Sequence, residues 1–193
     1  KDQVDMVLKN FNLFNIKKII PENLLKLEGV VDGIASIRKI KKALLFTSDL
    51  KFNKIKINDY LVGNGEAKSV WNTVKESLKL DGKFYRDQIP TILFGGFYYP
   101  KKENESLDIK FELYQTELDM FDSYIEDFVS NVEGKANAKL TIEGNLKKPK
   151  LNGYITLHNP SFHINYLNTS YNANLFKINV VPDMISFDNM ELL

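Results

Sequence analysis

Hydrophobic and polar residues alternate with a period of two along most of this sequence, and that period predicts β-strands. The clearest case is the segment 136–146, in which every even position is apolar or glycine and every odd position is polar. The same alternation recurs at 50–57, 78–84, 107–113, 151–157, 162–166, 176–180 and 185–187. Short turns separate these segments, so we expect about ten to twelve strands in an antiparallel sheet with one face in water.

Two segments replace this alternation with a spacing of three to four residues, which is the period of a helix. The apolar stripe from Leu118 to Val132 predicts an amphipathic helix over 118–132. Pro21 is well placed to begin a second, short helix at 22–26. The alternation also changes parity inside 50–57, which predicts a β-bulge or a turn at Asn53-Lys54.

The helical segments end near similar triplets, Leu27-Glu28-Gly29 and Val132-Glu133-Gly134, and alternating strands follow each triplet. This order of elements predicts two repeats, 1–105 and 106–193, that are continuous with each other. The run Lys101–Ser106 is the best candidate for a solvated turn between them. The fold class expected is therefore mostly β, an elongated, curled antiparallel sheet built of repeats, with two or three short helices.

The apolar side of the strands carries no charge, which makes it the candidate binding face. A sheet of this size has to bury that face in a barrel, in a sandwich, or around something that is not protein. The candidate groove residues are Leu50, Phe52, Leu78, Leu80, Ile109, Phe111, Leu140, Ile142, Leu146, Leu151, Ile155, Leu157, Phe162, Ile164, Tyr166, Phe176, Ile178 and Val180. Alternation alone indicates that one face of the sheet is shielded from water, and it does not identify what covers that face.

Charge and composition exclude several functions. Lys and Arg number 26 and Asp and Glu number 25, so the formal net charge is +1 and no footprint for nucleic acid is present. The chain has no cysteine and two histidines, His158 and His163, which leaves little material for thiol or zinc chemistry. We expect no catalytic residues, no metal and no cofactor.

Two local features have ordinary structural explanations. Gly63–Lys68 is rich in glycine but lacks the spacing of a phosphate-binding loop, so a hairpin turn is the expected structure. The acidic residues Asp119, Asp122, Glu126 and Asp127 would form the solvated face of the 118–132 helix and not a pair of catalytic carboxylates. No stretch approaches the length of about 18–20 apolar residues that a membrane span needs. We interpret the chain as part of a longer protein.

The second repeat resembles a known family. Four features of the second repeat are similar to the C-terminal region of the TamB family, in its Bacteroidetes-type form: the alternating segment from Gly134 to Gly144, Pro149, the Leu151-Asn152-Gly153 strand start and the run Ile164–Tyr171. TamB is the translocation and assembly module subunit of the AsmA-like superfamily. The resemblance covers 130–193, and 11–65 fits more loosely because Arg38–Lys42 stands where the proline turn would be.

The resemblance implies a β-taco, which is a lengthwise curled sheet with an apolar groove. It further implies a periplasmic segment of a protein anchored in the inner membrane, with phospholipid and an outer-membrane β-barrel of the TamA or BamA kind as partners. The function expected is a non-enzymatic bridge that carries acyl chains between the membranes, supports outer-membrane protein assembly, or both. The alternatives are a structural β-solenoid or adhesin-type module with a closed core, and a lipocalin-like carrier. An enzyme has no motif behind it.

Overall fold

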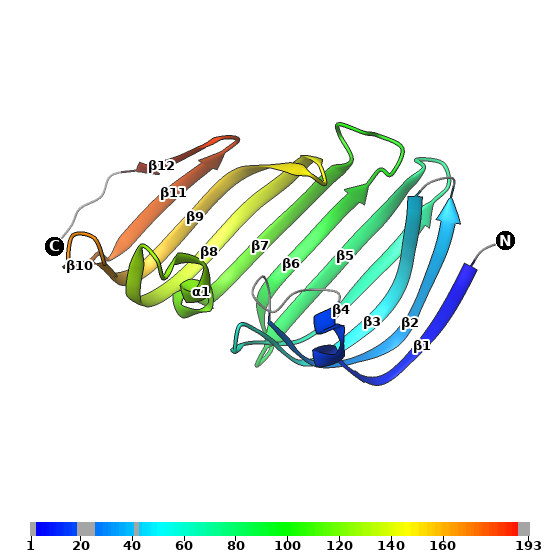
Figure 1. Cartoon of the computed structure of the whole chain (residues 1–193), viewed down its shortest axis with the longest axis horizontal. Helices are drawn as coiled ribbons and strands as arrows, with labels where there is room; N and C mark the ends of the chain where they lie inside the picture. Colours follow the sequence, from blue (N-terminus) through cyan, green and yellow to red (C-terminus); the bar gives the residue numbers. More distant parts are fainter. Residues whose placement is uncertain (1–2, 19–25, 41–42, 189–193) are drawn as a thin grey trace.

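The computed structural model describes residues 3–18, 26–40 and 43–188, and nearly all of them belong to one antiparallel sheet (Figure 1). The twelve strands are β1 (Gln3–Asn12), β2 (Leu27–Ile40), β3 (Ala43–Ile57), β4 (Tyr60–Asn72), β5 (Ser77–Arg86), β6 (Ile89–Tyr98), β7 (Leu107–Glu117), β8 (Val129–Asn145), β9 (Lys148–Ile164), β10 (Thr169–Asn172), β11 (Leu175–Val181) and β12 (Met184–Asp188). Consecutive strands are neighbours from β1 to β9. Both β10 and β11 then pair with β9, one after the other along the same edge.

The sheet curls and stays open, as the sequence predicted. β1 and β12 form its two edges and do not pair with each other, so the sheet does not close into a barrel (Figure 1). The alternating positions fall on opposite faces, because successive side chains of a strand point in opposite directions. The fold class, mostly β with a curled antiparallel sheet and few helices, is confirmed.

β-Bulges bend the strands near one margin of the sheet. Lys54 has a φ of 51°, and the pairing of β3 with β4 shifts register around it, so the bulge predicted at Asn53-Lys54 is confirmed. Gln115 of β7 has a φ of 47° at a similar shift. The Oδ1 atom of Asn64 accepts the Lys54 N–H at 2.8 Å, and that of Asn137 accepts the Gln115 N–H at 2.7 Å. Each bulge increases the local twist and bend of its strand.

The described helical elements are shorter than predicted. They are the 3-10 helices η1 (Leu13–Lys18) and η2 (Leu118–Phe121) and the α-helix α1 (Asp122–Ile125). The helix predicted at 118–132 is wrong beyond residue 125, because Val129 begins β8 and pairs with Ile164 of β9. Val129 and Val132 are β-branched, and this favours a strand once a partner edge is available.

Residues 22–25 of the other predicted helix lie outside the described residues. Among the described helices, none has both the length and the hydrophobicity needed to cross a membrane.

The two predicted repeats join without a break in the sheet. β6 pairs with β7 from Ile92 to Tyr98, on either side of the boundary proposed at residue 105. The triplet glycines, Gly29 and Gly134, occupy equivalent positions, with φ values of 125° and 111° at register shifts of β2 and β8. In the Gly134 bulge an added Cβ would lie 2.8 Å from the Asn159 carbonyl oxygen. The triplets therefore mark bulged strand starts that only glycine fits.

The hairpin turn predicted at Gly63–Lys68 is wrong. This segment lies in the middle of β4, with β3 on one side and β5 on the other. Gly63 has a φ of 116°, and an added Cβ would overlap the Tyr85 carbonyl group of β5. The glycines permit a close approach between strands and do not form a chain reversal.

Candidate functional site

One row of residues crosses the concave face without a polar side chain. We call it the central row, and its members lie opposite one another in the register of ten strands: Leu8, Gly33, Leu50, Ala67, Gly82, Phe94, Phe111, Leu140, Gly153 and Val180. Every member is half-buried and none is fully buried. A closed core would bury such side chains completely, so this part of the face has no covering layer of described residues.

The rows on either side are also apolar. The first flanking row consists of Phe11, Val31, Phe52, Gly65, Phe84, Ile92, Leu113, Ala138, Ile155 and Ile178. The second consists of Met6, Ala35, Ser48, Ser69, Leu80, Gly96, Ile109, Ile142 and Leu151. The hydroxyls of Ser48 and Ser69 lie 3.0 Å apart and hydrogen-bond to each other. The three rows thus form an apolar surface with no charged side chain, which we call the groove.

Glycines lie beside aromatic residues in the floor of the groove. Phe94 lies over Gly82 and Phe84 lies over Gly65, so that a Cβ at either glycine would overlap the ring. The glycines expose backbone that the aromatic rings of the neighbouring strands cover. Aromatic rings thus cover the backbone of two strands in the floor.

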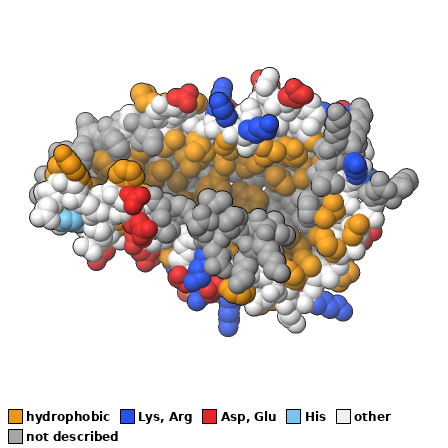
Figure 2. Space-filling view, viewed as in Figure 1, with side chains coloured by type: hydrophobic (Ala, Val, Ile, Leu, Met, Phe, Trp, Pro, Cys, Tyr) orange, Lys and Arg blue, Asp and Glu red, His pale blue; other side chains and the backbone are white. Residues whose placement is uncertain are grey.

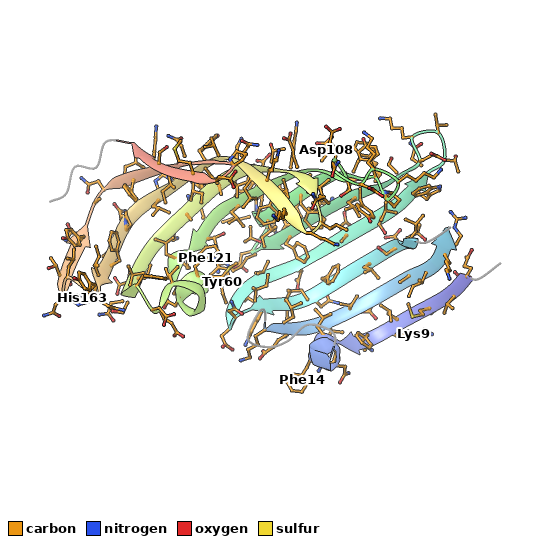
Figure 3. All side chains as sticks on the ribbon, turned by 45° about the horizontal axis from the view of Figure 1, so that its top comes forward. Lys9, Phe14, Tyr60, Asp108, Phe121 and His163 are labelled. Atoms are coloured by element: carbon orange, nitrogen blue, oxygen red, sulfur yellow. The ribbon has the colours of Figure 1, made fainter. Side chains whose placement is uncertain are left out.

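One margin of the groove is packed by the helical inserts. Met120 and Phe121 contact a cluster that includes the buried Tyr60, Val62 and Ile92, and Leu13 of η1 packs against the same cluster. Tyr60 and Phe121 lie close to this margin in Figure 3. The described residues leave the central row half-buried, and Figure 2 shows a hollow lined by hydrophobic side chains on this face.

The convex face carries the charges. Asp49 lies opposite Lys68, with 2.7 Å between Oδ2 and Nζ, and Glu66 lies opposite Lys83, also at 2.7 Å. The hydrogen bond from Lys83 holds the pKa of Glu66 below its usual range, and the same bond raises the pKa of Lys83. These side chains are about half exposed, so the pairs mainly keep this face hydrated and contribute little to stability.

Most of the predicted groove residues lie on the groove. The central and flanking rows contain Leu50, Phe52, Leu80, Ile109, Phe111, Leu140, Ile142, Leu151, Ile155, Ile178 and Val180. Leu78, Leu157 and Phe176 continue the same parity toward the ends of their strands, where Leu78 and Phe176 are buried. Phe162 and Ile164 follow the bulge in β9, and Phe162 packs under the insert with Leu118.

Two predicted groove residues are in turns. Leu146 lies in the turn between β8 and β9 and is 63 % exposed, and Tyr166 lies in the turn between β9 and β10 and is 95 % exposed. Both residues were predicted by continuing the alternation past the end of a strand. The chain reverses there, so neither side chain lies on the concave face. Those two predictions are wrong.

Several members of the groove were not among the residues predicted from the sequence, and Phe94, Ile92 and Phe84 are members with large side chains. In β6 the convex positions Leu93 and Phe97 are apolar too, so the strand shows no alternation in polarity. The signal that could have found it is the pairing of Phe94 with Phe111, once β6 is placed beside β7.

Titratable groups do not converge in the groove. Asp122 lies at the start of α1, and burial, with Asp119 and Glu126 nearby, raises the pKa of its carboxyl. The part of the chain that the structure describes has no group of three or more histidine and carboxylate side chains arranged to hold a metal ion.

Comparison of the chain with protein-family models, with curated proteins and with solved structures finds no match.

Proposed function

We propose that this chain is a segment of a lipid conduit whose groove holds acyl chains, and that it acts without catalysis. The observation that carries the proposal is the central row, an uncharged and half-buried line of residues that crosses ten strands. An apolar surface of this size is rarely left open in a soluble protein unless something binds to it.

The physical gain from acyl-chain binding is large. Two tails with about 30 methylenes, at about 0.8 kcal/mol for each, give on the order of 25 kcal/mol for removal from water. A charge in the groove would oppose this transfer, because an unpaired charge next to hydrocarbon is costly. The three rows contain none, and their only polar side chains, Ser48 and Ser69, bond to each other.

The dimensions suit an extended tail. Ten strands spaced about 4.8 Å apart give a central row of about 43 Å, whereas the tails of one bilayer leaflet span about 15 Å. The row reaches β1 at one edge of the sheet, and both edge strands are unpaired among the described residues. Among the described residues the sheet does not close into a barrel, which suits a conduit better than a closed cup.

The resemblance to the TamB family supports a cellular setting. On that proposal the chain belongs to a periplasmic protein anchored in the inner membrane, moves phospholipid toward the outer membrane, and meets an outer-membrane β-barrel partner. The unpaired edges offer strand addition to such a partner or to a further segment of the same protein.

The test is lipid content measured by native mass spectrometry, followed by solvent extraction. Ile142 lies in the second flanking row opposite Ile109, and its neighbour Thr141 points to the convex face opposite Lys110. We expect phospholipid to co-purify with the wild-type chain and with Thr141→Asp, and to be lost from Ile142→Asp.

All three proteins should be folded by circular dichroism, because Ile142 is half-buried and no described layer packs on it. A wild-type chain that is folded, monodisperse and free of lipid after incubation with phospholipid vesicles would contradict the proposal. The structural module would then be the better explanation.

A further inference from the structure

A second apolar surface lies outside the groove, at the tips of two loops near the β12 end of the sheet. Phe128, between α1 and β8, is 73 % exposed, and Tyr166 and Leu167, between β9 and β10, are 95 % and 53 % exposed. We call these three residues the aromatic tip. His163, the second-last residue of β9, marks this end of the molecule in Figure 3.

Asn165 joins the two loops into one unit. Its backbone N–H donates to the Phe128 carbonyl oxygen at 3.0 Å, and its Nδ2 donates to the Glu126 carbonyl oxygen at 2.9 Å. Its Oδ1 accepts the hydroxyl of Ser130 at 2.7 Å. The exposed side chains are thus held together by a fixed support and do not belong to two independent loops.

The hairpin that carries Tyr166 and Leu167 of the tip has no charge. From Leu151 to Phe176 the sequence contains no Lys, Arg, Asp or Glu, whereas 26 % of the whole chain is charged. Local bonds also satisfy the polar groups of the turn. Thr169 Oγ1 donates to the Leu167 carbonyl oxygen at 3.0 Å, and the Asn168 N–H donates to the Asn165 carbonyl oxygen. Below the turn, the rings of Phe162 and Tyr171 stack with centroids 6.0 Å apart.

We infer that the aromatic tip inserts into the interface of a neutral lipid bilayer. Tyr and Phe favour that region because their rings bury apolar area while the hydroxyl of Tyr stays at the headgroups. A bilayer also accepts a small protruding surface, whereas a stable protein interface needs about 20–30 residues on each side. The carboxylates nearest the tip, Glu126 and Asp127, would be repelled by anionic headgroups, so a zwitterionic surface is the better partner.

This inference does not depend on the groove holding lipid, and the experiment keeps the two apart. Phosphatidylcholine vesicles are mixed with the 193-residue chain, and the partition coefficient is measured by sedimentation. The double variant Phe128→Ser/Tyr166→Ser should lower the partition coefficient by about tenfold for each side chain removed. The control Tyr154→Ser, which removes an aromatic from the convex face of β9, should retain the wild-type value, and the tip variant should keep the lipid that the wild-type groove holds.

A second measurement reports where the tip lies. Trp71 is the only tryptophan, so Tyr166→Trp in a Trp71→Phe chain gives a single fluorophore at the tip. We expect its emission to shift to the blue with phosphatidylcholine vesicles and to be quenched by brominated phosphatidylcholine. Replacing part of the phosphatidylcholine by phosphatidylglycerol should weaken the partition.

Three results with vesicles would overturn the inference. They are no partition of the folded wild-type chain, a partition that the tip variants leave unchanged, and an unquenched fluorophore. Self-association that depends on the tip, seen by analytical ultracentrifugation without vesicle binding, would also overturn it and identify a second copy as the occupant.

Discussion

The rings of Phe52 and Phe84 meet with centroids 5.3 Å apart, although their strands, β3 and β5, are separated by β4. The residue between them in the register is Gly65, which has no side chain on the concave face. An aromatic pair thus spans a whole strand and covers its backbone. This contact links three strands of the groove floor in one unit.

Gly65→Ala should therefore destabilise the fold. A Cβ at this position would overlap the Phe84 ring and lie 2.5 Å from the Lys83 carbonyl oxygen, so the floor has to shift at a cost of about 1–3 kcal/mol. Urea denaturation measures the change. Gly95→Ala is the matched control, because the nearest atom to its Cβ is the flexible Asp81 Oδ1 at 3.3 Å, and it should be neutral or slightly stabilising. Equal effects at the two glycines would argue against the ring contact.

Thr116→Val should stabilise the chain by about 1 kcal/mol. Thr116 is 1 % exposed, and its Oγ1 finds no hydrogen-bond partner within the described structure. Valine keeps the shape and removes the unsatisfied hydroxyl. Thr91 is also buried, but its Oγ1 donates to the Val62 carbonyl oxygen at 2.9 Å, so Thr91→Val should destabilise. Thermal melts of the two variants should shift in opposite directions, and a loss of stability in Thr116→Val would show that its hydroxyl has a partner.

Asn64→Ala should cost about 1 kcal/mol, because the Lys54 N–H at the β3 bulge loses its acceptor. Asn64→Asp keeps an acceptor oxygen and should recover most of that loss. Equilibrium denaturation of the pair separates the bulge contact from a general effect of position 64. If the Asp variant were as unstable as the Ala variant, the hydrogen bond would not be the cause.

Asp122→Asn should raise the melting temperature at pH 7. Burial together with Asp119 and Glu126 raises the pKa of Asp122 in the folded state, so the ionised carboxylate weakens the fold. The folded state then binds more protons than the unfolded state between the two pKa values, and stability falls as the pH rises through that window.

The gain from Asn should disappear below a pH of about 4, where Asp122 is protonated in both states. Asp119→Asn is the comparison variant, because it removes part of the charge repulsion on Asp122. It should give a smaller gain in stability with the same pH dependence. A gain for Asp122→Asn that is constant with pH would contradict this explanation.

The period of two determined most of the fold. Residues such as Leu140, Ile142 and Ile155 lie on the concave face. Their strands alternate between apolar and polar residues, and only one orientation of each strand turns the apolar residues away from water. The parity change at Lys54 was equally local, since a bulge adds one residue to one strand. These features depend on neighbours in the chain, and for that reason the sequence alone predicted them.

Tertiary pairing decided the rest. Val129 and Val132 carry a helical spacing, but the edge of β9 offers a full set of main-chain hydrogen bonds and the segment becomes a strand. The chain reversals at Leu146 and Tyr166 end the alternation, and only the folded chain shows where each strand stops. The alignment of ten strands in one uncharged row depends on the register between strands, which a single sequence does not encode locally. That register lines up the members of the central row, which the described residues leave half-buried and without a covering layer.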